Sequence, residues 1–472
     1  MKISFPLRIY LVALVLRLIP VLLTSNLGIG LDDMFQYDML ARSLASGNGY
    51  RWYAQDDLNL LAPYVDFDLS TAKGYDPEYG LYTSFRAPLY PAFLAVVYFF
   101  SGLDFSRFFF ARIAQVFFLG APLAPLTYFV ARLIFPENEK TQRVSAWIVA
   151  CYPMLLVYPL GLGTENLFFV LLLASVFFLL KFLDKPTNTN VLLTGFFLAL
   201  TTLTRSVILP FVVLSILYLL YIHRQKALLA GLAFILVVLP WVIRNSLLHH
   251  KLTGVETSMG YNLYLGYIPQ GNGSFVFGPS LDLLTIMDDA ERDEVGIKMG
   301  VGFIKDQPER FLPLALNRLG FFFGLEKRVL MYFYSNNLLG YIPQPALLTA
   351  ASILLLPFVF VAVFAVFGGA SLKRTPQAVL LALLFFAYIL PHVLILAEDR
   401  FHLALLPYFA ILAAYAGELI SRRSLHFDKL KWVISFVLVA LLLLNWGLEL
   451  NRDADKIAIL LSPDGNTSWF PY

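Results

Sequence analysis

The sequence has 472 residues, of which 59% are hydrophobic and 14% are charged. Soluble domains carry about 25% charged residues, so this composition excludes a soluble protein and predicts an integral membrane protein. The net charge of +3 decides little, because in membrane proteins the placement of the charges sets the orientation. The single cysteine excludes an intrachain disulfide, and no nucleic-acid partner is expected.

Long apolar runs predict helices that cross the roughly 30 Å hydrocarbon core of a bilayer. The first run ends near Leu27 and resembles a signal sequence, but it lacks a small-residue cleavage site, so we expect a retained anchor. The run 190–222 is interrupted by LTRS and predicts two short helices that meet at Arg205. The eleven predicted spans are 5–27, 107–133, 143–162, 165–183, two within 190–222, 227–245, 345–367, 377–397, 402–420 and 432–450.

The apolar segment 87–101 is short for a span and contains two prolines. If it does not cross, the basic loops all fall on the cytoplasmic side, as the positive-inside rule requires. We therefore expect an interfacial or re-entrant helix, a cytoplasmic N-terminus and a C-terminus outside. The inner loops then carry Arg132, Lys140, Arg143, Lys181, Lys185, Arg224, Lys226, Lys373, Arg374, Arg422, Arg423, Lys429 and Lys431.

This topology places two large loops on the outer face and predicts three regions. Residues 1–245 form a transmembrane module that includes the first outer loop, 28–106. Residues 246–344 form the second outer loop, with interfacial helices, and 345–472 form the C-terminal helices and a short outer tail. The fold class is therefore an all-α polytopic membrane protein with about eleven transmembrane helices. No repeat relates the two halves, which weighs against an inverted-repeat transporter.

Charged residues gather at the outer ends of the predicted spans. Charges at membrane depth are costly, so each is a functional candidate. Arginine offers a planar, permanently charged fork for phosphate oxygens, and a carboxylate can take a proton from an attacking hydroxyl. The set suits sugar transfer from a lipid phosphate. Its members are Asp32, Asp33, Arg86, Glu165, Arg205, Arg244, Glu398, Asp399 and Arg400.

Each candidate also has a structural interpretation. Asp32 or Asp33 suits the N-cap of a helix over 34–46, and Glu165 suits the cap of the span at 165–183. Arg205 and Arg244 could extend to the membrane interface, as arginines near span ends often do.

Arg17, near the middle of the first span, predicts a buried partner that the sequence does not identify. His249 and His402 are candidate metal ligands, but no spacing motif supports them, and a structural role is the stronger expectation.

Seven segments in order resemble the GT-C glycosyltransferases, in particular the group of protein O-mannosyltransferases, lipid A aminoarabinose transferases and rhizobial galacturonosyl transferases. Each segment is weakly specific alone, and the ordered set covers most of the chain. The segments are DDMFQYDMLARSLASGNGY, FRAPLYPAFLAVVYFFSG, YPMLLVYPLGLGTENLFF, LALTTLTRSVILP, LPWVIRN, GYNLYLG and EDRFHLALLPY.

The resemblance implies a GT-C fold and an inverting transfer of a sugar from a polyprenyl-phosphate carrier, on the extracytoplasmic face of the plasma membrane. The acceptor would be a glycan, lipid or protein. The family's catalytic Asp stands four residues before a Tyr, which implies that Asp33 is catalytic, that Asp32 tunes it, and that Tyr37 lies at the substrate.

The same resemblance implies that Glu165 is the second acidic position and that Arg86 and Arg400 bind the donor. Ser206 stands where the family has Pro, which bears on local geometry only. Relatives differ in their use of a divalent metal ion, so metal dependence stays open.

Two rival functions concern the same class of substrate. A lipid-linked sugar flippase or transporter would need a path across the bilayer, which the one-sided charges do not indicate. An O-antigen polymerase or ligase would use diphosphate-linked oligosaccharides, and no ordered motif matches that class. Only the monophosphate-dependent transferase predicts release of polyprenyl phosphate.

Overall fold

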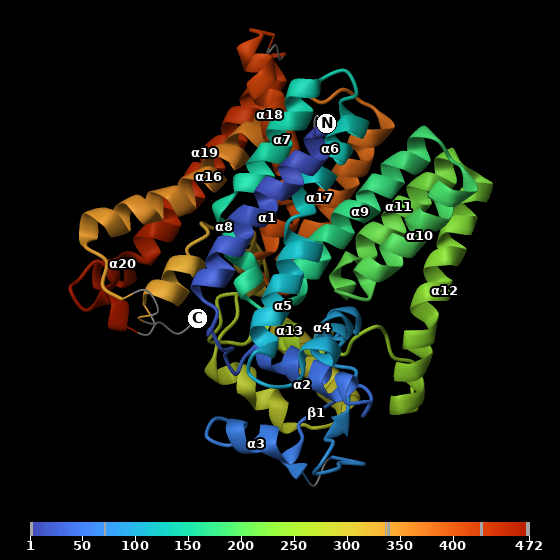
Figure 1. The fold of residues 1–472 in the computed structure, drawn as a ribbon, viewed down its shortest axis with the longest axis vertical. Coiled ribbons are helices and arrows are strands. Elements are labelled where there is room, and N and C mark those ends of the chain that lie inside the picture. Colours follow the sequence, from blue (N-terminus) through green and yellow to red (C-terminus); the bar gives the residue numbers. More distant parts are fainter. Residues whose placement is uncertain (1–2, 70–71, 336, 338–339, 425–427, 469–472) are drawn as a thin grey trace.

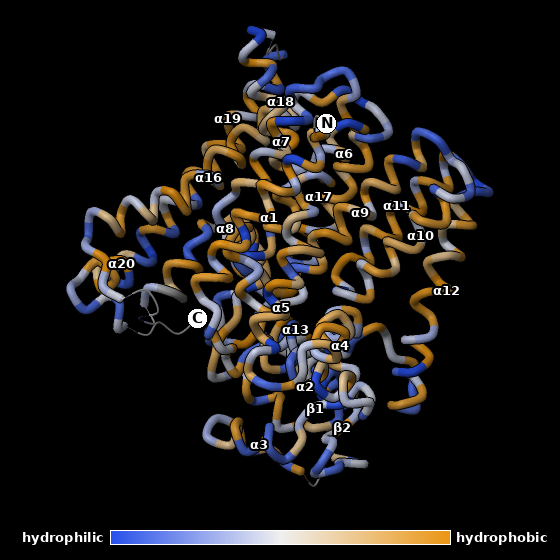
Figure 2. The backbone as a smooth tube through the Cα atoms, in the orientation of Figure 1, coloured by the Kyte–Doolittle hydropathy of each residue, from blue (hydrophilic) through white to orange (hydrophobic). Residues whose placement is uncertain are grey.

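The computed structural model describes residues 3–69, 72–335, 337, 340–424 and 428–468. Long helices lie side by side in one layer, and shorter elements form a second layer at one end of them (Figure 1). Hydrophobic residues dominate the long helices, whereas the second layer mixes polar and apolar residues (Figure 2). The predicted all-α polytopic membrane protein is confirmed, with one small two-stranded sheet in the described residues.

Among the described residues, eight helical segments are long and apolar enough to cross a membrane, and a ninth is bent. The eight are α1 (Phe5–Leu23), α5 to α6 (Arg107–Ile134), α9 (Thr164–Asp184), α12 (Arg224–His249), α16 (Gln344–Ala370), α17 (Pro376–Leu394), η8 with α18 (Phe401–Ser421) and α19 (Lys429–Arg452).

The bent segment consists of α7 (Glu139–Cys151) and the helical turns Pro153–Leu160, inclined by 53°. The two remaining predicted spans are the shorter α10 (Asn188–Thr202) and α11 (Leu209–Ile222). They are separated near Arg205, as predicted, and pack against α12. By length alone, eight or nine of the eleven predicted spans therefore qualify as full crossings.

The outer layer is built from both large loops. The first loop contributes α2 (Asp33–Ala45), β1 (Arg51–Trp52), α3 (Gln55–Leu61), β2 (Leu81–Tyr82) and α4 (Leu89–Ser101). The second contributes α13 (Met259–Tyr267), η5 (Gly278–Thr285), α14 (Asp289–Asp306), η6 (Pro308–Arg310), α15 (Phe311–Phe322) and η7 (Leu330–Tyr334). The chain ends with α20 (Ala454–Leu460) and η9 (Gly465–Thr467). Strands β1 and β2 are antiparallel.

Helix α4, with 13 residues, is shorter than the helices that are long enough to cross a membrane. Arg86, just before α4, pairs with Asp33, and Arg107, just after α4, pairs with Asp38. Both acids belong to α2, and their separation of five residues corresponds to roughly 7.5 Å of helix. The segments before and after α4 therefore both lie beside α2, an arrangement that suits the expected interfacial helix.

The two outer loops form one packed unit. The Thr83 hydroxyl and the Ser84 backbone N–H both donate to the Asp289 carboxylate, at 2.5 and 2.7 Å. The backbone N–H of Thr257 donates to the Ser84 carbonyl at 3.0 Å. A buried cluster joins the same segments and includes Phe35, Trp52, Phe85 and Met287.

Candidate functional site

Asp32 and Asp33 are adjacent but make different contacts. Asp32 is the N-cap of α2, and its Oδ1 accepts a hydrogen bond from the Met34 backbone N–H at 2.8 Å. Asp33 is the first residue of the helix, and its carboxylate contacts two arginines instead. Asp32 therefore performs the capping, and Asp33 is available for chemistry.

Two arginines from opposite ends of the chain hold Asp33. Arg86 donates from Nη2 to Asp33 Oδ1 and from Nε to Gln36 Oε1, the latter at 2.8 Å. Arg400 Nη2 lies 3.7 Å from Asp33 Oδ2. The Asp33 side chain is still 43% exposed, so these pairs do not close it off from a substrate.

Glu165 belongs to the same network. Arg205 Nη1 lies 2.7 Å from Glu165 Oε1, and Arg400 Nε lies 3.7 Å from the same oxygen. Arg400 therefore lies between the two carboxylates, Asp33 and Glu165. The structure confirms that these residues share one side of the molecule.

The two aspartates have opposite pKa shifts. The surrounding protein and the neighbouring Asp33 charge both raise the pKa of Asp32. At Asp33, desolvation acts to raise the pKa, but the guanidinium groups of Arg86 and Arg400 outweigh it and hold the pKa below its usual value. Asp33 is therefore ionised at neutral pH. Opposed shifts in a neighbouring pair are typical of carboxylates with distinct tasks.

Tyr37 lies at the edge of this network. Its buried ring packs edge-on against Tyr90, with 5.3 Å between the centroids, and the Arg86 guanidinium lies 5.4 Å from its centre. Its ring therefore supports Arg86 from α2, the helix that carries Asp33.

Arg244 lies outside the network. Its Nη1 donates to the Thr83 carbonyl at 2.5 Å, and its guanidinium lies 4.9 Å from the centre of the Trp241 ring. These contacts tie the end of α12 to the strand segment of the first outer loop. They give Arg244 a structural task in this conformation.

The two candidate metal-ligating histidines are also engaged elsewhere. His249 Nε2 lies 2.6 Å from the Ser84 hydroxyl. His402 is fully buried, with Nδ1 2.8 Å from the Phe322 carbonyl and Nε2 3.0 Å from Glu326. A carbonyl oxygen only accepts, so Nδ1 carries a proton and donates.

The residues at the site do not fit a divalent metal ion. The oxygens of Asp33 and Glu165 already face guanidinium groups, and a bound cation would have to displace them. No group of three His, Cys, Asp or Glu suited to a metal ion occurs among the described residues.

Arg328 is a site residue that the sequence did not single out. Its Nη2 lies 2.6 Å from Glu398, and Glu398 lies 3.5 Å from Arg400 Nε. The sequence feature that could have indicated Arg328 is a basic residue between two aromatic runs, in FFFGLEKRVLMYFY. Its partner, however, comes from a loop 70 residues later.

Comparisons with known proteins found similar solved structures but no similar sequence family. No protein-family model and no curated protein matches the sequence. An Archaeoglobus fulgidus oligosaccharyltransferase tethered with an acceptor peptide shares 15% identity, with a TM-score of 0.49 over 100% of this chain. The enzyme AglB from the same organism, in complex with an inhibitory peptide and a dolichol-phosphate, shares 13% sequence identity, with a TM-score of 0.48 over 99% of this chain. The apo form of the oligosaccharyltransferase shares 14% sequence identity, with a TM-score of 0.48 over 99% of this chain. This chain spans 56% to 60% of the length of those chains.

Proposed function

We propose that the protein is a membrane glycosyltransferase of the GT-C type. It moves a hexosyl or pentosyl group from a polyprenyl-phosphate carrier to an acceptor hydroxyl on a glycan, lipid or protein. One observation carries the proposal: the accessible Asp33 carboxylate lies between the guanidinium groups of Arg86 and Arg400. A base and phosphate-binding cations are the two requirements of this reaction.

The reaction is a single displacement. Asp33 removes the proton from the acceptor hydroxyl as the acceptor oxygen forms a bond to the anomeric carbon of the sugar. The bond from that carbon to the phosphate oxygen breaks, and polyprenyl phosphate leaves with the electron pair. Arg86 and Arg400 stabilise the negative charge that develops on the phosphate.

The network also links donor binding to activation of the base. In the structure, Arg86 and Arg400 lower the pKa of Asp33, which makes it a weak base. A bound phosphate competes for the same two guanidinium groups. As it draws their charge away from Asp33, the carboxylate becomes more basic, so the donor itself prepares the base for the acceptor.

The charge distribution supports a site on the extracytoplasmic face of the plasma membrane, or the inner membrane of a bacterium. The basic loops predicted to be cytoplasmic lie at the helix ends away from Asp33, with Lys140 and Arg422 both paired to Glu418 there. The positive-inside rule assigns that end to the cytoplasm, together with the N-terminus.

The test compares Asp33→Asn with Asp32→Asn in the purified protein. Asn and Asp are about equal as N-caps, so Asp32→Asn keeps α2 intact. With a polyprenyl-monophosphate sugar as donor, we expect Asp33→Asn to lower the rate of polyprenyl phosphate release by about a hundredfold or more. We expect Asp32→Asn to release it at the rate of the wild type. Donor binding should persist in both variants.

Full activity in both variants would refute the proposal, and loss in Asp32→Asn alone would move the base by one residue. A flippase would release no polyprenyl phosphate in any variant.

A further inference from the structure

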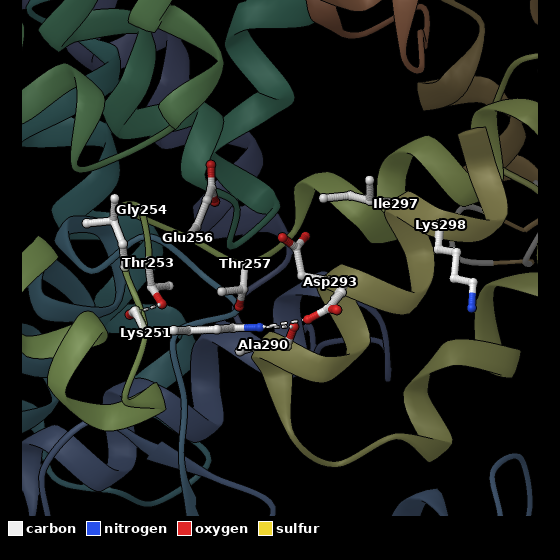
Figure 3. A pocket seen from close by; sticks show the side chains of 11 residues that line it. Lys251, Thr253, Gly254, Glu256, Thr257, Ala290, Asp293, Ile297 and Lys298 are labelled. Carbon is white, nitrogen blue, oxygen red and sulfur yellow. Dashed lines mark hydrogen bonds and ion pairs between the residues drawn. The ribbon is translucent and has the colours of Figure 1, made fainter. Parts of the chain in front are cut away.

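A cavity of about 560 Å³ with both polar and apolar lining lies between the loop 251–257 and helix α14, within the second outer loop (Figure 3). Its volume falls in the range of roughly 300–1,000 Å³ that is usual for small-molecule sites. The Thr253 and Thr257 hydroxyls of the lining bond to the Lys251 carbonyl and to Ser84. The charged side chains of the lining are Lys251, Glu256, Asp293, Glu294 and Lys298. The cavity can therefore both donate to and accept from a ligand with many hydroxyls.

Two of the three carboxylates of the lining, Glu256 and Asp293, are each fixed through one oxygen. Glu256 Oε1 accepts from the backbone N–H and the hydroxyl of Ser206, at 3.0 and 2.5 Å. Asp293 Oδ1 accepts from the Gly260 backbone N–H at 2.6 Å. Within the described part of the chain, neither second oxygen accepts a hydrogen bond from another residue. Each carboxylate is thus oriented and keeps an acceptor for a ligand.

The wall that carries Asp293 is rigid. A Cβ at Gly260 would lie only 1.9 Å from the Asp293 carbonyl oxygen, so the backbones of α13 and α14 are in direct contact there. Gly296 makes a similar approach to Gly260 from α14. When a site is already ordered in the free protein, binding does not require the free energy of ordering its side chains and loops, so affinity is higher.

The cavity adjoins the candidate catalytic site. Ser206, which donates to Glu256, directly follows Arg205, and Arg205 pairs with Glu165. The Tyr261 ring on α13 packs edge-on against Phe85, the residue before Arg86, with 5.6 Å between the centroids. The cavity therefore shares its supporting segments with both sides of the Asp33 network.

We propose that this cavity binds the acceptor, as an uncharged saccharide rich in hydroxyls. This inference rests on the proposed function and adds the class of acceptor to it. Sugar hydroxyls donate to carboxylates, and the open oxygens of Glu256 and Asp293 supply two oriented acceptors. The lining carries three carboxylates, Glu256, Asp293 and Glu294, against two lysines, Lys251 and Lys298, so an anionic ligand would meet a net negative charge.

The test uses methyl glycosides of glucose, galactose, mannose and N-acetylglucosamine, without donor, and measures binding to the protein in nanodiscs by saturation-transfer NMR. In Asp293→Asn and Glu256→Gln, the amide oxygen can still accept the hydrogen bond from the protein, and an NH₂ group replaces the carboxylate oxygen that faces the ligand. A hydrogen-bond donor thus replaces the acceptor. We expect at least one glycoside to bind and each variant to weaken it about tenfold or more.

The matched control is Glu291→Gln, which removes the same charge from α14 at an exposed position outside the cavity lining. It should bind like the wild type. The inference fails if no methyl glycoside binds, if binding survives Asp293→Asn, or if methyl glucuronide or a neutral tripeptide binds more tightly than every neutral glycoside.

Failure of this inference is distinguishable from failure of the proposed function. Absence of saccharide binding together with Asp33-dependent release of polyprenyl phosphate would refute the acceptor site and keep the transferase. Saccharide binding that depends on Asp293, without any release of polyprenyl phosphate, would keep the site and refute the transferase.

Discussion

At the scale of single residues, Arg400 is the centre of the charged network. It lies within 3.7 Å of both Asp33 and Glu165 and 3.5 Å from Glu398. Its Nε is buried and makes no hydrogen bond to any described residue. Arg400 therefore joins Asp33, Glu165 and Glu398 into one network, and its guanidinium group has the planar geometry that binds phosphate oxygens.

Replacement of Arg400 by Gln should weaken binding of the polyprenyl-phosphate donor. Loss of one charge-assisted contact costs about 1.5–3 kcal/mol, or roughly ten- to a hundredfold in affinity. The measurement is a donor titration of the purified protein, with Arg143→Gln, which breaks an exposed pair with Glu139, as the control. Unchanged donor affinity in Arg400→Gln would remove Arg400 from the site.

The acid side of the pH profile should identify the base. The dependence of kcat/KM on pH reports the free enzyme. The pKa of Asp33 is lowered, so Asp33 stays ionised from neutral pH down to its ordinary pKa of about 4, and the rate should fall only below that value. The pKa of Asp32 is raised, so Asp32 as the base would make the rate fall above about pH 4.

The variant Arg86→Gln tests the cause of this shift. It removes the strongest attraction on the Asp33 carboxylate, so the pKa of Asp33 should rise and the decline in kcat/KM should begin at a higher pH. A decline at the same pH in wild type and Arg86→Gln would show that Arg86 does not tune the base.

At the scale of elements, the break between α7 and Pro153 explains the buried Arg17. Proline lacks a backbone N–H, so the carbonyl of Val149 loses its donor in the helix. Arg17 donates to that carbonyl at 2.9 Å and to the Ala150 carbonyl at 3.0 Å. The predicted buried partner of Arg17 is thus a broken helix end, which the sequence did not identify.

A double-mutant cycle tests this pairing. Arg17→Met should lower the melting temperature of the purified protein, because an unsatisfied buried carbonyl costs about 1–3 kcal/mol. Pro153→Ala restores an N–H for Val149, so Arg17→Met should cost less in that background. Equal losses in the two backgrounds would show that Arg17 stabilises the fold in another way.

At the scale of the whole molecule, the ion pairs of α2 determine the path of the chain. Because Arg86 and Arg107 both pair with α2, we expect residues 46 and 104 to lie on one side of the membrane. Residue 137 follows α6, the end of a candidate span, so we expect it to lie on the other side.

Labelling with a membrane-impermeant maleimide tests this topology, starting from Cys151→Ser. Cysteines at the exposed positions Ser46 and Asp104 should react in intact cells, and a cysteine at Glu137 only after lysis. Opposite behaviour of Ser46→Cys and Asp104→Cys would show that α4 crosses after all. Reaction of Glu137→Cys in intact cells would reverse the proposed sidedness.

The sequence alone determined the membrane class, most of the spans and the shared side of Asp33, Arg86, Glu165 and Arg400, and it predicted an interfacial helix at 87–101. These features depend on hydrophobic length and on charge at span ends, which are local properties of the chain.

Only the tertiary structure showed that Asp32 and Asp33 make different contacts and that Arg244 and the two histidines bond to residues outside the charged network. It also showed that Arg328 belongs to this network and that a cavity lies beside α14. These outcomes depend on which atoms of distant segments come within hydrogen-bond distance. A cap and a salt bridge use the same carboxylate chemistry, so the residue types alone cannot tell them apart; the packing of α2 against the loops that carry Arg86 and Arg400 does.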